Sequence, residues 1–259
     1  KQVFKIALQY KGGFMITVII QPIAMLANIV LFKSIYAYNQ TATIKGYSLE
    51  QMIWYFTAGT FVFALTWNFA DSNLSRKILS GELAIDLLRP ISIFKLEFGQ
   101  AVALRLAAFF VEFLLGFVVF ILIIFPNFMS VASVLKFLAV VFFSFLLFFL
   151  VNFLIGLASF YIKSISSLGG LKMFLLLLTG GAFIPLEFFP AWAMRIINLL
   201  PFKYIYYWPV QFFLNREFTQ GIRLFLEVLG AQALWTIGLF ALCKLIWRFA
   251  VKKFCAAGG

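Results

Sequence analysis

The sequence predicts an all-α integral membrane protein with six transmembrane helices. Hydrophobic residues make up 64% of the 259 residues and charged residues only 12%, whereas soluble domains carry about 25% charged residues. A water-soluble fold of this length cannot bury so much apolar surface, so we expect the bilayer to be its solvent. Long charge-free apolar runs recur along the whole chain. We therefore expect one transmembrane domain over residues 1–259.

Each span is expected where an apolar run reaches the roughly 20 residues that cross the hydrocarbon core. In chain order the runs are Phe14–Phe32, Gln51–Ala70, Gln100–Phe125, Phe137–Ile162, about 170–183, and Val228–Trp247. The first run is too long for a signal-peptide core and no clear small-residue cleavage site follows it, so we expect it to be retained.

The segment before the first span has the pattern of an interfacial helix. Lys1, Lys5 and Gln9 recur every four residues, and apolar residues fill most of the other positions. This basic amphipathic pattern predicts a helix over residues 1–13 that lies in the membrane interface. The alternative is a solvated lead-in to the first span.

The distribution of Lys and Arg predicts the orientation. If both termini face inward, thirteen of these residues fall on the inner side and seven on the outer side. This bias places both termini in the cytoplasm and the chain in the cytoplasmic membrane. The net charge of +12 is scattered between apolar runs, which indicates contact with membrane lipids and not with nucleic acid.

One polar element interrupts the apolar sequence, at residues 71–99. Asp71 and Ser72 favour a helix start, Ser80-Gly81 breaks the helix, and Pro90 ends the next one. The orientation puts this element in the cytoplasm. A membrane protein with one structured, charged element on one side is expected to contact a partner there. The alternative is an ordinary helix lying on lipid headgroups.

A second interrupted segment covers residues 184–226. Prolines at positions 185, 190, 201 and 209 divide it into pieces too short to cross a bilayer. Non-helical backbone at membrane depth needs cover from protein or a wet cavity. We therefore expect short re-entrant or interfacial helices on the outer face, with aromatic side chains at headgroup level.

The sequence lacks the residues that most enzymes need. It has no histidine, its two cysteines have no metal-ligand spacing, and no phosphate-binding glycine loop occurs. We expect neither a catalytic site, nor a metal site, nor a bound cofactor in this chain. A lipid-modifying membrane enzyme is disfavoured for the same reason.

Two charged residues, Arg105 and Glu112, fall inside the third predicted span. An ionisable residue within a span is a functional hypothesis by default. Three interpretations remain open: a structural role, a place in a translocation path, and proton coupling through Glu112. Asn68 and Asn152 also lie in spans, where asparagines more often join helices than bind ligands.

Two stretches carry a resemblance to a known family. Ile78–Pro90 resembles the cytoplasmic loop of type-2 ABC exporter permeases, and Phe183–Trp192 followed by Leu200–Tyr204 is similar to the segment after span five in a drug-exporter-like bacterial branch. The resemblance extends over essentially the whole chain. It implies two permeases, identical or homologous, on two separately encoded ATP-binding subunits that hold ATP and Mg.

The resemblance also implies two sets of site residues. Contact with the ATPase would use Arg76, Ile78, Gly81, Glu82, Leu83, Asp86, Leu87, Arg89 and Pro90. Glu82 and Asp86 would pair with basic residues of the ATPase, and Leu83 and Leu87 would fill an apolar groove. Spans two and five would line the substrate path, with candidates Phe56, Gly59, Phe63, Trp67, Phe174 and Leu178.

The function expected from this likeness is ATP-driven export of an amphipathic or hydrophobic substrate, such as a drug, by the membrane subunit of a dimeric transporter. The 36 phenylalanines agree with such a cargo, although they also suit contact with lipid. The main alternative is an ion-coupled secondary transporter or channel that uses Glu112.

Overall fold

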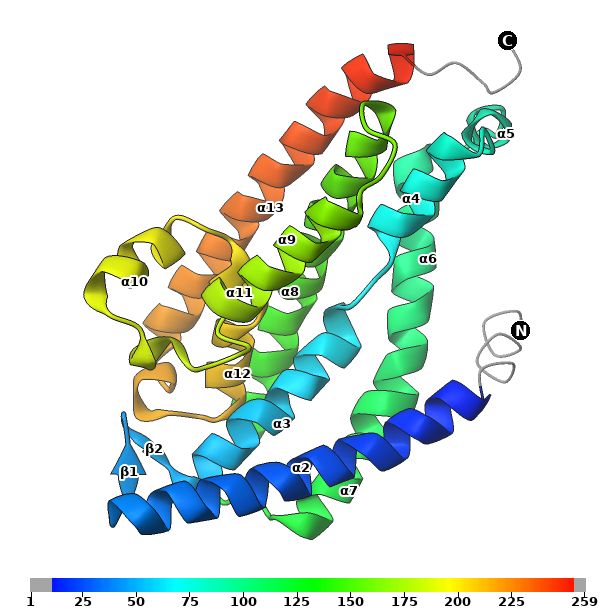
Figure 1. The fold of residues 1–259 in the computed structure, drawn as a ribbon. Helices are drawn as coiled ribbons and strands as arrows, with labels where there is room; N and C mark the ends of the chain where they lie inside the picture. Colours follow the sequence, from blue (N-terminus) through cyan, green and yellow to red (C-terminus); the bar gives the residue numbers. More distant parts are fainter. Residues whose placement is uncertain (1–10, 254–259) are drawn as a thin grey trace.

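The computed structural model describes residues 11–253, which form a helical fold with one very small hairpin (Figure 1). Most of the predicted interfacial helix at 1–13 lies outside the described residues. Helices occur at all six positions where spans were predicted. They are α2 (Lys11–Asn39), α3 (Leu49–Thr66), α6 (Ile93–Ala108) continued by α7 (Leu114–Ile123), α8 (Val131–Leu157), α9 (Ser166–Thr179) and α13 (Ile222–Ala250).

Two of these helices are long and apolar enough by themselves to cross a membrane. They are α8 with its 3-10 extension, Val131–Phe160, and α13. α8 forms the centre of the fold, because α3, α13 and the short helices α4 (Ala70–Leu79) and α12 (Tyr207–Phe213) all pack on it. α13 is exposed along most of its length.

Local sequence explains where several helices begin. Ser48 forms a capping box with Gln51 at the start of α3, and Ser130 forms one with Ser133 at the start of α8. Ser92 accepts a hydrogen bond from the backbone N–H of Lys95 and so caps α6. α6 therefore begins seven residues before the predicted start of span three.

Two features of the helices were not predicted. A two-stranded hairpin, Thr43–Ile44 with Tyr47–Ser48, joins α2 to α3, and its loop residues Lys45 and Gly46 both have positive φ, as a two-residue hairpin turn requires. A π-helical turn at Phe109–Phe113 separates α6 from α7. Glu112 lies within this turn.

The segment 184–226 forms short helices, as its prolines predict. They are the 3-10 turn Leu186–Phe188, α10 (Ala191–Asn198), α11 (Phe202–Ile205), α12, and the 3-10 turn Glu217–Thr219. Glu187 ties this segment to the hairpin, since Tyr47, Tyr207 and Arg216 all donate hydrogen bonds of 2.8–2.9 Å to its Oε1. Its location at the outer membrane face stays a prediction.

Different elements lie at the two ends of the fold. α5 (Leu83–Leu87), the start of α9 and the C-terminal end of α13 lie at one end, at the top of Figure 1. The hairpin and the start of α13 lie at the opposite end. The polar element at 71–99 thus lies at the α5 end.

Candidate functional site

The polar element at 71–99 folds as α4, a tight turn, α5 and the first turns of α6. Gly81 has a φ of +80°, a conformation that glycine adopts without strain, and it reverses the chain between α4 and α5. Pro90 follows the end of α5. α4 and α5 have only ten and five residues. Helices of this length need contacts with neighbouring helices to hold their position.

A buried charge cluster supplies those contacts. Lys77 Nζ of α4 lies 2.9 Å from Asp86 Oδ2 of α5 and 2.7 Å from Glu97 Oε1 of α6. All three side chains are buried. Burial alone lowers the pKa of Lys77, but its hydrogen bonds to Glu97 and Asp86 outweigh this and raise it. The lysine therefore stays charged and clamps the three helices together.

The outer surface of the element is apolar at its tip. Leu88 is 86% exposed and Ile85 is 62% exposed, and Leu79 is exposed beside them. Around them lie the exposed ion pair of Arg76 with Glu82, 2.7 Å long, and the exposed Arg89. Apolar side chains ringed by charged groups are typical of a protein contact surface.

Several residues assigned to the ATPase contact face inward. Leu83 is fully buried and packs with Ile78, Leu74 and Ile93 in one cluster of the core. Asp86 pairs with Lys77 and not with an external cation. α5 thus turns Leu83 and Asp86 toward α4 and α6, and their contact with a partner stays a prediction. Leu87, Glu82 and Arg89 are exposed, as that role requires.

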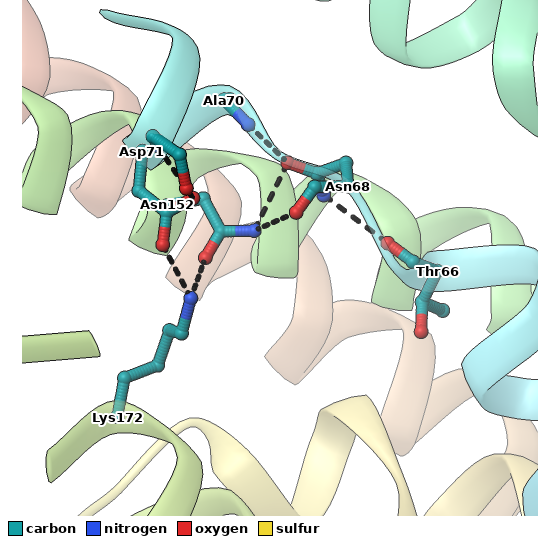
Figure 2. Close-up of polar contacts among 7 residues, drawn as sticks. Thr66, Asn68, Ala70, Asp71, Asn152 and Lys172 are labelled. Carbon is teal, nitrogen blue, oxygen red and sulfur yellow. Dashed lines mark hydrogen bonds and ion pairs between the residues drawn. The ribbon is translucent and has the colours of Figure 1, made fainter. Parts of the chain in front are cut away.

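A second buried polar network joins this element to the body of the fold (Figure 2). Lys172 Nζ of α9 lies 2.6 Å from Asp71 Oδ2 of α4 and donates a 2.6 Å hydrogen bond to Asn152 Oδ1 of α8. Asn152 Nδ2 in turn donates to the backbone oxygen and the Oδ1 of Asn68, both at 3.0 Å. The side chains of Lys172 and Asp71 are only 8% and 9% exposed.

The backbone geometry of the α3–α4 junction explains this network. The helical ladder stops after Thr66, and the Asn68 side chain replaces it by donating to the Thr66 carbonyl and accepting from the N–H of Ala70. Asp71 follows in the first turn of α4, where a carboxylate is favoured. One lysine thus links α9 to the point where α3 passes into α4.

Only part of this network could be predicted from the sequence. Asn68 and Asn152 were expected to join helices, and the hydrogen bonds that Asn152 donates to Asn68 confirm this. Lys172 was expected only as one of the thirteen Lys and Arg residues on the inner side of the membrane. Its position within an apolar helix, ten residues after Ile162, was the signal that could have marked it as paired.

The candidates for a substrate path on α3 divide into two groups. Phe56, Phe63 and Trp67 are half-buried and lie on one stripe of the helix, together with Thr60. Gly59 lies beside this stripe and is buried, and a Cβ there would lie only 1.7 Å from the hydroxyl oxygen of Tyr206, whose ring also packs against Phe63. Gly59 therefore gives Tyr206 room to pack.

The close approach at Gly59 gives a stability prediction. Replacing Gly59 by Ala should lower the melting temperature, because overpacking costs about 1–3 kcal/mol and outweighs the helix gain of up to about 1 kcal/mol. The matched control is Gly99→Ala in α6, where nothing lies within 4 Å of the added Cβ. Equal melting temperatures for the two variants would contradict the packing role.

The two candidates on α9 occupy its less buried side. Phe174 is 58% exposed and Leu178 is half-buried. Lys172 belongs to the same helix, but its side chain is buried in the protein. α9 therefore presents an apolar face outward, and its buried Lys172 pairs with Asp71 of α4 on the inner side.

Arg105 and Glu112 lie apart from both networks. Arg105 Nη1 donates to the carbonyl oxygen of Ala64, near the end of α3. Glu112 is half-buried, and the contacts of residues 11–253 include no hydrogen bond or ion pair for it. Arg105 thus joins α6 to α3, which favours a structural role for this residue.

A search of the described residues finds no group of three or more His, Cys, Asp or Glu side chains able to hold a metal ion. The polar groups that do gather form ion pairs and amide contacts between helices. These ion pairs join α4 to α5, α6 and α9.

Comparison with known proteins identifies the family. The family model described as "ABC-2 family transporter protein" matches residues 22–258, which is nearly the whole chain. Neither the curated proteins nor the solved structures gave a match. The chain belongs to the ABC-2 transporter family: it is a type-2 ABC permease, the integral membrane subunit of an ABC transporter that works with an ATP-binding partner.

Proposed function

We propose that this chain forms, as a dimer with an identical or homologous copy, the membrane part of an ATP-driven exporter in the cytoplasmic membrane. Six helices would cross the bilayer, with both termini in the cytoplasm, and the substrate would be amphipathic or hydrophobic. The observation that carries the proposal is the apolar tip at Ile85 and Leu88, held on a rigid, ion-paired element.

The tip supports contact with a separate ATPase for an energetic reason. Fully burying a Leu or Ile side chain contributes about 1.5–3 kcal/mol, and both side chains are largely exposed in the isolated chain. Arg76, Glu82 and Arg89 of the same element are also exposed and can form hydrogen bonds and ion pairs with the rim of a groove. This arrangement provides the apolar centre and polar rim of a protein interface.

The buried ion pair of Lys172 with Asp71 supports transmission of force. Movement of α4 against α9 would break the ion pair between Asp71 and Lys172 in a poorly solvated site, which is costly. α4 and α9 are therefore expected to move together. In this proposal the ATPase pushes α4 and α5, and Lys172 carries the displacement to α9, whose outward face lies along the substrate path.

The ATPase contact is tested by co-purification with the ATP-binding partner subunit. The double variant Ile85→Asp with Leu88→Asp should reduce the captured ATPase by roughly tenfold or more, since two apolar contacts are lost. The matched control is Ile196→Asp with Leu199→Asp, two exposed apolar residues outside the proposed contact.

The control variant should retain the ATPase at the wild-type level. Full retention by the Ile85 and Leu88 variant, or equal loss by both variants, would count against this contact. Transport by the isolated chain with no ATPase present would instead favour the ion-coupled alternative that uses Glu112.

A further inference from the structure

A pocket of about 510 Å³ opens between the α5–α6 connection, α8 and the last turns of α13. It lies at the α5 end of the fold and is separate from the Lys172–Asp71 network. Its volume falls within the range of small-molecule sites, about 300–1,000 Å³. Neither the proposed ATPase contact nor the proposed substrate path accounts for this pocket.

The floor of the pocket is aromatic. Phe94 of α6 packs against Phe153 of α8 and against Phe240 of α13, with ring centroids 5.2 Å apart in both pairs. Phe240 is also exposed at the surface. Trp247 lines the pocket one to two turns further along α13. The apolar surface of the pocket therefore continues through Phe240 onto the exposed side of α13.

The rim of the pocket is basic. Arg89, Lys95 and Lys244 are among the lining residues, and no lining residue is acidic. Arg89 Nη1 lies 3.4 Å from Asp86 Oδ1, but neither Lys95 nor Lys244 has an ion-pair partner within residues 11–253. By contrast, the buried lysines of this fold, Lys77 and Lys172, are both paired with carboxylates.

The first turn of α6 adds to the positive potential. α6 begins at Ile93, and Ser92, Ile93 and Lys95 line the pocket. The side chain of Ser92 accepts a hydrogen bond from the N–H of Lys95, whereas the other N–H groups of a first helical turn lack acceptors within the helix and favour anions. Two free lysines, an arginine and a helix start therefore converge above an aromatic floor.

We propose that this pocket binds an anionic phospholipid of the leaflet at the α5 end. The phosphate lies between Lys95 and Lys244, and the upper part of an acyl chain lies on Phe94 and Phe240. Basic pockets between membrane helices are suited to such headgroups, and the apolar floor excludes a purely hydrophilic anion. The inference rests on the proposed membrane placement, in which this end faces the cytoplasm.

The test measures lipid retention by the isolated permease, without any ATPase, using native mass spectrometry. Phosphatidylglycerol is the anionic probe, phosphatidylcholine the zwitterionic one, and glycerol phosphate the free headgroup. We expect Lys95→Gln with Lys244→Gln to weaken phosphatidylglycerol binding about tenfold or more. The control Lys163→Gln with Lys252→Gln removes two exposed lysines of the same end that do not line the pocket.

Three further results are expected. The control variant binds phosphatidylglycerol as the wild type does, Lys95→Arg with Lys244→Arg retains binding, and glycerol phosphate does not displace the lipid. Equal losses in the glutamine variant and the control would overturn the proposal. So would equal retention of phosphatidylcholine, or displacement by glycerol phosphate, which would indicate a site for a free anion.

The result is independent of the ATPase contact. The Ile85→Asp with Leu88→Asp variant should bind phosphatidylglycerol normally, because neither residue lines the pocket. Loss of lipid selectivity with normal ATPase capture overturns only the lipid site. If the wild-type chain captures no ATPase but binds phosphatidylglycerol selectively, only the proposed function is overturned.

Discussion

Replacing Lys172 by Met is expected to destabilise the protein by about 3–5 kcal/mol, the usual cost of leaving one member of a buried ion pair alone. Asp71 would lose its cationic partner in a site where its side chain is 9% exposed, and the Oδ1 of Asn152 would lose its donor. For a chain of this size the loss corresponds to a fall in melting temperature of roughly 6–20 °C. Thermal unfolding of the purified protein measures it.

The double variant Asp71→Asn with Lys172→Met separates charge from packing. Because no charge is left unpaired, it should regain most of the lost stability, since neutral replacements for a buried pair are often tolerated. Lys163→Met, at an exposed lysine, should leave the melting temperature unchanged. A melting temperature for Lys172→Met equal to that of Lys163→Met would contradict the buried pair.

Replacing Lys77 by Met is expected to have a comparable effect on stability and a larger one on assembly. The substitution removes the cation that lies between Asp86 and Glu97. Among the described residues, buried Glu97 would then have no ion-pair partner, and Asp86 would keep only its 3.4 Å contact with the exposed Arg89. Stability should fall by about 5 kcal/mol. α5 should separate from α4 and α6, and ATPase capture should fall although Ile85 and Leu88 are unchanged.

The triple variant Lys77→Met, Asp86→Asn and Glu97→Gln is the control. Removing all three charges should restore stability, because no carboxylate then requires a partner. ATPase capture should recover with it if α5 regains its position. Normal ATPase capture by Lys77→Met alone would show that the charge cluster does not position the tip.

Much of the helical layout could be predicted from the sequence, for physical reasons. Apolar runs of sufficient length located all six helices, and prolines correctly divided residues 184–226 into short ones. The break at Ser80-Gly81 was also predicted, since glycine accommodates the positive φ found at Gly81. The hairpin at Thr43–Ser48 was missed because its strands are only two residues long.

Which side chains of a helix are buried and which are exposed could not be predicted in the same way. In α5, Leu83 and Leu87 have the spacing of a binding face, but packing against α4 buries Leu83 and exposes Ile85 and Leu88. On α3, Gly59 was a candidate for the substrate path, but the structure buries it against Tyr206. These outcomes depend on neighbours that are distant in sequence, and nearly uniform hydrophobicity gives no pattern to distinguish the faces.

The sequence could mark Lys172 as a paired residue within an apolar helix, but it could not identify the partner, for the same reason. Asp71 and Lys172 are separated by 101 positions, and each has an ordinary local explanation as a helix-start carboxylate and a flanking lysine. Only the packing of α4, α8 and α9 brings them together.

The central claim is that the ATPase cycle reaches α9 through Lys172 and Asp71. The most direct measurement is the alkylation rate of a cysteine introduced at the exposed Phe174, in a chain whose Cys243 and Cys255 are replaced by Ala. With the ATPase bound, the rate should change several-fold between the nucleotide-free and the ATP-trapped complex. In the Asp71→Asn with Lys172→Met background the ATPase should still bind, but the rate should no longer respond to nucleotide. An undiminished response in that background would contradict the claim.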